Sequence, residues 1–339
     1  MWRQILLLVL LCVSADLAQA QGLDVIHCTD STFCVPSVWG MPRSKALIFE
    51  YENVFSHRLR ATSDLEAVGN GSGELQREER LDFKLRFPIY LSESFKMALG
   101  FSYFNEDYIF KDFDNPDYAL FQSLDDKNLK SMGMALYLTK AWKGKHYFIM
   151  RISTDLNGDY KAGVLPRDRY LRVSIAPMFG VKKDAWTSYG GGIAWGYNFG
   201  RPTIYPFFVY NRTFNDKLGI ESILPANAML RVNFSQSMIL YSGVALEGSS
   251  YTIRPSGEAL AQFETLQLRK SEIRLFANLE REIHDWFWFN VEAGVRFSYR
   301  FELAENLLYN PETIIDMRRR PAPFLKAGVF LVPPKKFLE

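Results

Sequence analysis

The chain has 339 residues, with 40 Lys and Arg against 38 Asp and Glu, so its formal net charge at pH 7 is only +2. This balance gives no electrostatic support to a nucleic-acid partner. Aromatic residues make up 15% of the chain, and no apolar run beyond residue 20 reaches the ~18 residues that a transmembrane helix needs. The composition therefore excludes a helical membrane protein, and it fits strands in which every other residue faces water.

The first twenty residues have the pattern of a secretory signal peptide. Trp2-Arg3 supplies a basic lead, residues 5–13 form an apolar run of nine, and Ala18-Gln19-Ala20 is a small-x-small cleavage site. The apolar run is too short to cross a bilayer as a helix. We therefore expect residues 1–20 to be removed and the mature chain to begin at Gln21, outside the cytoplasm.

Two cysteines stay in the mature chain, in the segment 21–44 that precedes the first strand. Cys28 and Cys34 would lie in an oxidising compartment, which favours a disulfide across a small loop. His27 makes a metal site an alternative, but two Cys and one His leave a tetrahedral site one ligand short. Free thiols are the third alternative. We expect residues 21–44 to form a periplasmic segment with a Cys28–Cys34 disulfide.

Long runs in which apolar and polar residues alternate recur along the rest of the chain. Strict period-2 alternation predicts β-strands, because successive side chains of a strand point to opposite faces. The alternating apolar positions include Leu47, Phe49 and Tyr51; Leu81, Phe83, Leu85, Phe87 and Ile89; Phe95, Met97, Leu99, Phe101 and Tyr103; Met132, Met134, Leu136 and Leu138; Phe148, Met150 and Ile152; and Leu171, Val173 and Ile175.

The clearest pair of strands lies at residues 271–300. One apolar series begins at Ile273, and a second begins at Phe287 after a turn at His284. The second run covers about a dozen residues, longer than the ~5 to 6 residues of a usual strand. Each run has one face that is almost wholly apolar and one that carries charge. This pattern predicts a long hairpin between lipid and water.

The connections between the strands differ at the two ends. Short turns fall near residues 92, 144, 183, 216, 236 and 283, whereas the other ends carry longer loops at 58–79, 105–127 and 301–320. Outer-membrane barrels have short periplasmic turns and longer extracellular loops. The sequence thus predicts an all-β fold, a single antiparallel transmembrane β-barrel at residues 45–331 with a C-terminal tail at 332–339.

The expected number of strands is about 12 to 14. Pro225 cannot donate to a strand ladder and favours a break between residues 219–224 and 229–234, which gives 14 strands. Fusing that region gives 13, an odd number that antiparallel closure disfavours. The alternative fold is a secreted β-sandwich, whose strands are shorter and whose turns recur every ~8 to 12 residues.

One stretch resembles a known group of proteins. It runs through Asn215-Asp216-Lys217-Leu218-Gly219, Leu224-Pro225-Ala226 and the series Leu240-Tyr241-Ser242-Gly243-Val244-Ala245-Leu246. In these residues the chain resembles an uncharacterised family of predicted outer-membrane β-barrel proteins of Bacteroidota-like bacteria. The resemblance covers residues 203–253 and implies the fold and the bacterial outer membrane as location, but no activity.

The water-facing positions supply the candidate functional residues. Mixed charges at close strand spacing indicate cross-strand ion pairs that brace or fill a barrel. A second interpretation is a basic wall that selects anions, because several of the cations fall on consecutive strands with few acids nearby. The lumen candidates are Lys84, Arg86, Lys96, Lys130, Arg151, Arg172, Glu272, Arg274, Glu292 and Arg296, together with Asp82 and Glu280.

An enzymatic site is not expected. The four histidines, His27, His57, His146 and His284, have no recognisable nucleophile motif near them. A lipid-modifying barrel enzyme stays open as an alternative, because such a site can be assembled from distant strands. No phosphate-binding loop, zinc spacing or calcium loop is present, so no cofactor or metal is predicted.

We therefore predict an outer-membrane β-barrel that acts as a passive pore or structural barrel with a mixed-charge lumen. The alternative function is a surface binding or assembly protein that works through the three long loops. The expected partners are outer-membrane lipid, the barrel-assembly machinery and small solutes, and no nucleic acid.

Overall fold

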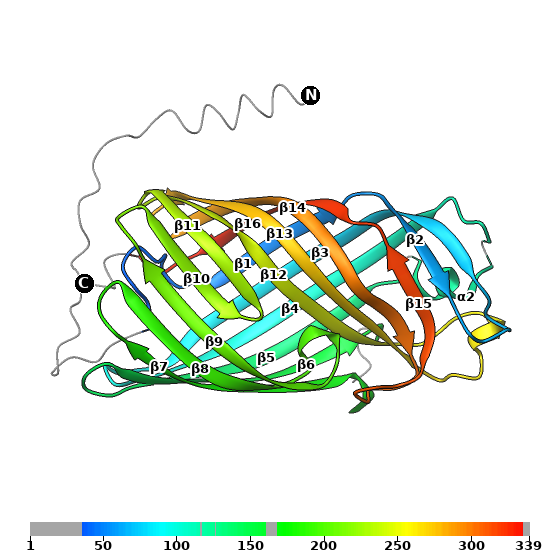
Figure 1. Ribbon diagram of the computed structural model, residues 1–339, viewed down its shortest axis with the longest axis horizontal. Coiled ribbons are helices and arrows are strands. Elements are labelled where there is room, and N and C mark those ends of the chain that lie inside the picture. The colour runs from blue at the N-terminus through cyan, green and yellow to red at the C-terminus, as the bar shows by residue number, and fades with distance from the viewer. Residues whose placement is uncertain (1–35, 116, 126, 161–167, 335–339) are drawn as a thin grey trace, which may run out of the picture.

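A computed structural model describes residues 36–115, 117–125, 127–160 and 168–334. Sixteen strands of this part of the chain form one antiparallel sheet (Figure 1). Their bounds are β1 Leu47–Val54, β2 His57–Thr62, β3 Gly71–Leu91, β4 Phe95–Lys111, β5 Leu129–Ala141, β6 His146–Gly158, β7 Leu171–Lys182, β8 Thr187–Gly196, β9 Thr203–Thr213, β10 Leu218–Leu224, β11 Asn227–Ser235, β12 Met238–Ile253, β13 Leu266–His284, β14 Phe287–Ala304, β15 Thr313–Arg319 and β16 Ala322–Leu331.

Fourteen of these strands close into a barrel. β1 pairs with β3 on one side and with β16 on the other, and β16 in turn pairs with β14. β2 and β15 pair with each other and with β3 and β14, and so extend the sheet beyond the ends of β1 and β16. β10 and β11 form a hairpin around Pro225, as the break at the proline predicts. The predicted barrel is confirmed, with the even strand number.

Apolar side chains cover the outside of the barrel. In the β13–β14 pair, Ile273 lies opposite Phe297 and Leu275 opposite Val295, with Leu275 46% exposed. Their neighbours Glu272 and Arg296 point to the other side and are buried. The predicted hairpin at residues 271–300 therefore has its apolar face outward, where lipid would replace the water of an ordinary protein surface.

The three predicted long loops are mostly regular structure, so those loop predictions are wrong. Residues 58–79 contain most of β2 and the start of β3, 105–127 contain the end of β4 and the helix α2 (Ala119–Leu124), and 301–320 contain the end of β14 and nearly all of β15. These strand ends are polar because they rise above the lipid. Short 3-10 turns occur at η1 Asp168–Tyr170, η2 Asn198–Gly200 and η3 Glu258–Leu260.

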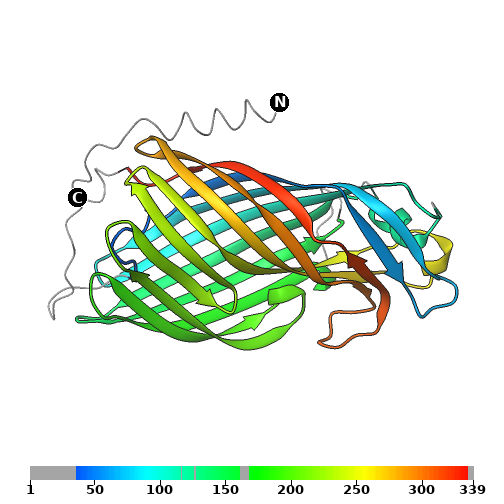
Figure 2. The same cartoon turned by 45° about the horizontal axis from the view of Figure 1, so that its top comes forward.

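The two ends of the barrel differ in construction. α2, β2 and β15 gather at one end, and the short turns lie at the other (Figures 1 and 2). The β10–β11 hairpin ends part-way along the barrel in both views. None of the described helices is long or apolar enough to cross a membrane.

Candidate functional site in the barrel lumen

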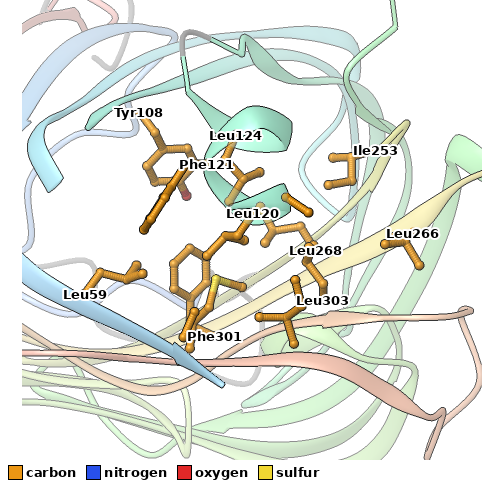
Figure 3. Close-up of a cluster of buried hydrophobic side chains, with 14 of the residues drawn as sticks. Leu59, Tyr108, Leu120, Phe121, Leu124, Ile253, Leu266, Leu268, Phe301 and Leu303 are labelled. Carbon is orange, nitrogen blue, oxygen red and sulfur yellow. The ribbon is translucent and has the colours of Figure 1, made fainter. Parts of the chain in front are cut away.

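A hydrophobic core closes the extracellular end of the barrel, and we call it the cap. Leu120, Phe121 and Leu124 of α2 turn toward Tyr108 and Phe301 on the inner wall (Figure 3). The Phe121 ring lies 5.3 Å from Phe110. The cap also contains Leu59, Ala61, Val68, Leu75, Tyr118, Ala119, Leu129, Tyr251, Ile253, Leu260, Leu266, Leu268, Leu303, Ile314, Ile315 and Met317. Apolar packing of this kind excludes water from that mouth.

The cap is built from the segments that were predicted to be loops. Tyr118, just before α2, donates from its hydroxyl to the Gly69 carbonyl at 3.2 Å, and burial raises the pKa of Tyr118 to about 12. Ser123 of α2 donates to the Ala119 carbonyl and also contacts the Ser256 carbonyl in the segment between β12 and β13. These loops therefore pack on one another, which leaves less surface for a partner than free loops would.

Below the cap, the inner faces of β1, β3, β4, β13, β14 and β16 are filled by ion pairs, and we call this side the filled half. Arg80 Nε lies 2.8 Å from Glu106 Oε1, and its Nη2 lies 3.0 Å from Glu272 Oε2. Arg296 holds Glu52 through two hydrogen bonds of 2.7 and 2.8 Å, and its Nη1 lies 3.0 Å from Glu272 Oε2. All five side chains are 6% exposed or less.

The network continues in both directions along the barrel. Toward the cap, Lys270 pairs with Glu106 and donates to the Tyr108 hydroxyl at 3.2 Å. Toward the periplasm, Lys326 Nζ lies 3.3 Å from Glu292 Oε2 and 3.5 Å from Glu50 Oε2. Acids and bases alternate through the network. It therefore braces the wall, because each buried charge has partners of the opposite sign.

The periplasmic end is occupied by the chain segment before β1, residues 36–46. The Trp39 carbonyl accepts hydrogen bonds from Thr213 Oγ1 at 2.5 Å and from Arg231 Nη2 at 3.2 Å. Lys182 Nζ donates to the Ser37 carbonyl at 2.8 Å, and Val38 is only 5% exposed. The segment is thus tied to the inner faces of β7, β9 and β11.

Between the cap and this segment lies a cavity of about 880 Å³ against the inner faces of β5–β9. We call this side the hollow half. Its volume falls within the ~300–1,000 Å³ of typical ligand sites. The wall is largely aromatic and apolar, and Arg80, Lys270 and Glu272 of the filled half border it. The lining includes Tyr137, Tyr147, Ile149, Arg151, Asp155, Ala176, Met178, Ala194, Tyr197, Tyr205, Phe207 and Val209.

Small residues make room for the cavity. Gly180 lies opposite Tyr147, and a side chain at that glycine would overlap the Tyr147 ring. A side chain at Gly192 would likewise overlap the Phe207 ring. Gly180 of β7 and Gly192 of the predicted glycine-rich strand β8 therefore leave room for the rings of Tyr147 and Phe207 on neighbouring strands.

The cavity reaches the barrel wall at the end of the β10–β11 hairpin. β11 pairs with β12 only as far as Asn227 opposite Ala245, although β12 continues to Ile253. Ile223 and Asn227 at the hairpin end line the cavity together with Ser249 of β12. Nearer the cap, β12 touches β6 instead, through Thr252 and Gly158. The wall is therefore shortest beside the cavity.

The structure brings some of the predicted lumen residues together and separates others. Glu272, Arg274, Glu292 and Arg296 share the ion-pair network. Glu280 forms a separate ion pair with Lys45 at 2.5 Å. Lys84 pairs with Asp82 at 2.5 Å. Lys96 lies on the inner face near the periplasmic end, opposite Thr139.

The six predicted cations do not form one wall. Arg86 and Arg151 both lie over the Tyr137 ring, at 5.3 and 5.8 Å from its centroid. Arg172 is buried between β7 and β12, where its Nη2 donates to Thr252 Oγ1 at 3.0 Å. Lys130 faces outward, because it has the same parity as Met132 and Met134, so its placement in the lumen was wrong.

The remaining sequence candidates stand apart from the cavity. His57 is buried in β2, where its Nδ1 contacts the Phe55 carbonyl at 2.9 Å. His146 is the first residue of β6 and His284 the last residue of β13, and both lie next to short turns. His27, Cys28 and Cys34 lie outside the described residues. The disulfide and the signal peptide therefore stay predictions.

Sequence reasoning missed the aromatic wall of the hollow half. Tyr137, Tyr147, Tyr205 and Phe207 occupy inward-facing positions. The signal was present in the alternation, since Tyr137, Tyr205 and Phe207 fall between apolar positions and Tyr147 precedes one. Aromatic residues on a water-facing parity are the feature that would have pointed to an apolar cavity.

The fold and the lumen define the class: the protein is an outer-membrane β-barrel, with an apolar outer surface, short turns at one end and a charged interior. It is a 14-stranded barrel whose lumen is occupied at both ends and hollow between them. A scan against family models finds no match, and a search among curated proteins finds none. Membership of the resembled family stays a prediction.

Solved structures with a similar fold are outer-membrane barrels. A FadL homologue from Pseudomonas aeruginosa is 8% identical, with 89% of this chain and 99% of that chain covered and a TM-score of 0.43. An outer membrane channel from Pseudomonas putida F1 is 9% identical, with 86% and 98% covered and a TM-score of 0.38. The toluene transporter TodX of Pseudomonas putida is 8% identical, with 86% and 90% covered and a TM-score of 0.35.

Proposed function

We propose that the barrel is a non-enzymatic channel that binds a small, largely apolar solute in the hollow half during passage across the outer membrane. The observation that carries this proposal is the cavity of about 880 Å³, which is lined mainly by aromatic and apolar side chains and lies between two occupied mouths. A water-filled pore for ions would instead need a polar path from end to end. Because the cap closes the extracellular end of the barrel, the structure favours this proposal over a permanently open pore.

The polar groups of the cavity suit a solute with one polar or anionic group. Arg151 is exposed to the cavity, and among the described residues no carboxylate lies within 4 Å of its guanidinium. It is held over Tyr137 instead. A guanidinium in this position can donate two parallel hydrogen bonds to a carboxylate. An aromatic acid would place its ring among Tyr147, Ile149 and Phe207 and its charge beside Arg151.

The hairpin end offers a route to the cavity that leaves both mouths closed. Ile223 and Leu224, the last two residues of β10, are 43% and 47% exposed. Because β11 stops at Asn227, the hairpin tip is tied to β12 at its very end by the bond from the Leu246 amide to the Ala226 carbonyl at 2.7 Å, and opening of this part of the wall would begin there. Solute exchange at the hairpin end is thus part of the proposal.

Binding of 2-naphthoate to the mature barrel in lipid nanodiscs tests the proposal, with empty nanodiscs as blank. Ala176 faces the cavity opposite Arg151, and Ala293 faces lipid. We expect Ala176→Trp to weaken binding at least tenfold by filling the cavity, and Ala293→Trp, the matched control, to leave it unchanged. Equal binding by both variants, or no binding by the unaltered barrel, would refute the proposal.

A further inference from the structure

An exposed row of arginines covers the outer face of β2 and β15, just beyond the barrel wall. Arg58 and Arg60 alternate on β2 with buried Leu59 and Ala61 of the cap. On β15, Arg318 lies directly opposite Arg60 in the strand register. The backbone amide of Arg320 donates to the Arg58 carbonyl at 3.2 Å, which sets these two residues side by side.

This arginine face begins where the lipid-facing surface ends. On the outer side of β1 the series Phe49, Tyr51 and Phe55 is 43 to 45% exposed. Beyond Phe55, the next exposed positions along the chain are Ser56 and Arg58. The neighbouring strand repeats this order, from Leu325 of β16, which is 47% exposed, to Arg320. The arginines therefore lie at the height of lipid headgroups on the side that carries the cap.

Nearby acids do not balance the four guanidiniums. Asp316 lies 3.5 Å from Arg318, whose side chain is still 87% exposed. Glu74 is opposite Arg58 in register, but its carboxylate bonds the Ser56 hydroxyl and lies 3.6 Å from Lys111. In the part of the chain that the structure describes, Arg58, Arg60 and Arg320 have no carboxylate within 4 Å. Like charges directly opposite in a sheet destabilise it unless an anion lies between them.

We propose that the arginine face binds the phosphate groups of an anionic outer-leaflet lipid. Arginine donates to phosphate in a fixed fork, often with two parallel hydrogen bonds. A headgroup with two phosphates can bridge the opposed pair Arg60 and Arg318, and its acyl chains would lie along Phe55 and Leu325. This site is separate from the cavity, so the proposal of lipid binding does not depend on the proposal of a solute in the cavity.

Native mass spectrometry of the mature barrel with diphosphoryl lipid A tests the site, with phosphatidylcholine as the lipid lacking a net anionic charge. The variant pair Arg60→Gln and Arg318→Gln should weaken binding of the first lipid at least fivefold and leave the second unchanged. Arg212→Gln is the matched control, because Arg212 is an exposed arginine near the opposite end of the barrel. Heat-modifiable migration on gels reports whether each variant is folded.

Two further arms complete the test. Arg58→Gln with Arg320→Gln should weaken binding in the same way, so a folding failure of the first pair leaves a second readout. Inorganic phosphate at 10-fold excess should displace little lipid if the site needs the headgroup held in the membrane. Unchanged binding of diphosphoryl lipid A in the folded double variants, or full displacement by inorganic phosphate, would overturn the proposal.

Discussion

The two halves of the lumen, built from strands of similar alternation, are put to different uses. In the filled half, buried charges such as Arg80, Glu272 and Arg296 meet in the centre and leave no room for a solute. In the hollow half, glycines on β7 and β8 leave room for the aromatic rings that line a cavity against β5–β9. The difference teaches that the inward residues of a barrel decide its interior, whereas the outward residues are nearly the same all round.

The filled half contains buried ion pairs in which each charge depends on its partner of opposite sign. A buried ion pair brings little net stability over a well-packed apolar pair, but removal of one partner leaves an uncompensated charge and costs about 3–5 kcal/mol. In the hollow half, Arg151 is exposed, lies over the Tyr137 ring and has no carboxylate within 4 Å among the described residues, so its removal breaks no ion pair. We therefore expect the two halves to respond differently to the same substitution.

The largest expected effect is that of Arg296→Met. Arg296 is the partner of Glu52, Glu247 and Glu272, and its loss should lower the free energy of unfolding by about 3–5 kcal/mol. Urea titration of the detergent-solubilised barrel, followed by gel migration, measures this change. Arg151→Met in the hollow half is the control and should stay within about 0.5 kcal/mol. An equal loss of unfolding free energy in the two variants would contradict the proposed difference between the halves.

The cap should respond to loss of one ring. Phe121 is 1% exposed and its ring lies 4.8 Å from Phe113 and 5.4 Å from Tyr118. Phe121→Ala should destabilise the cap by about 3 kcal/mol through the lost contacts and the space left behind. Protease cleavage within residues 112–128 should accelerate while the barrel strands stay protected. Phe214→Ala, an exposed residue in a periplasmic turn, is the control. Slow cleavage in both variants would mean that the cap is not a packed unit.

The smallest expected effect concerns the segment at the periplasmic mouth. Arg231→Met removes the bonds to the Trp39 carbonyl and Thr213 and also the ion pair with Glu221. The lost bond to the Trp39 carbonyl should loosen the segment itself by about 1–3 kcal/mol, whereas loss of the partner of Glu221 acts on the barrel wall. Val38→Cys, in a background without Cys28 and Cys34, reports the release as faster reaction with a thiol reagent. Arg212→Met should leave the rate unchanged. If Arg231→Met also leaves it unchanged, the segment is held by other contacts.

The sequence predicted the wall of the barrel better than its contents. Alternation sets which side chains face lipid, so the outward faces of β13 and β14 and the hairpin at Pro225 were predictable. Strand ends above the lipid have no apolar face toward the membrane. For this reason the sequence pattern predicted loops where the structure has β2 and β15. Lys130 was wrongly predicted to face the lumen, although its spacing of two residues from the outward-facing Met132 indicates the outer face.

Contacts across the lumen had no local signal. Arg80 and Glu272 are 192 positions apart in the chain and meet only because β3 and β13 face each other inside the closed barrel. The cap likewise joins α2 to β2, β13 and β15. A pattern of residues predicts that such charges point inward, but not which of them meet or which side stays empty.

The most direct test of the solute cavity is a crystal structure of the barrel soaked with 6-bromo-2-naphthoate. The anomalous signal of bromine marks the ring independently of the lipid and detergent around it. The account predicts a bromine peak within the hollow half, between Phe207 and Ile149, with the carboxylate beside Arg151. Bromine peaks confined to the lipid-facing surface, or an interior without any, would contradict it.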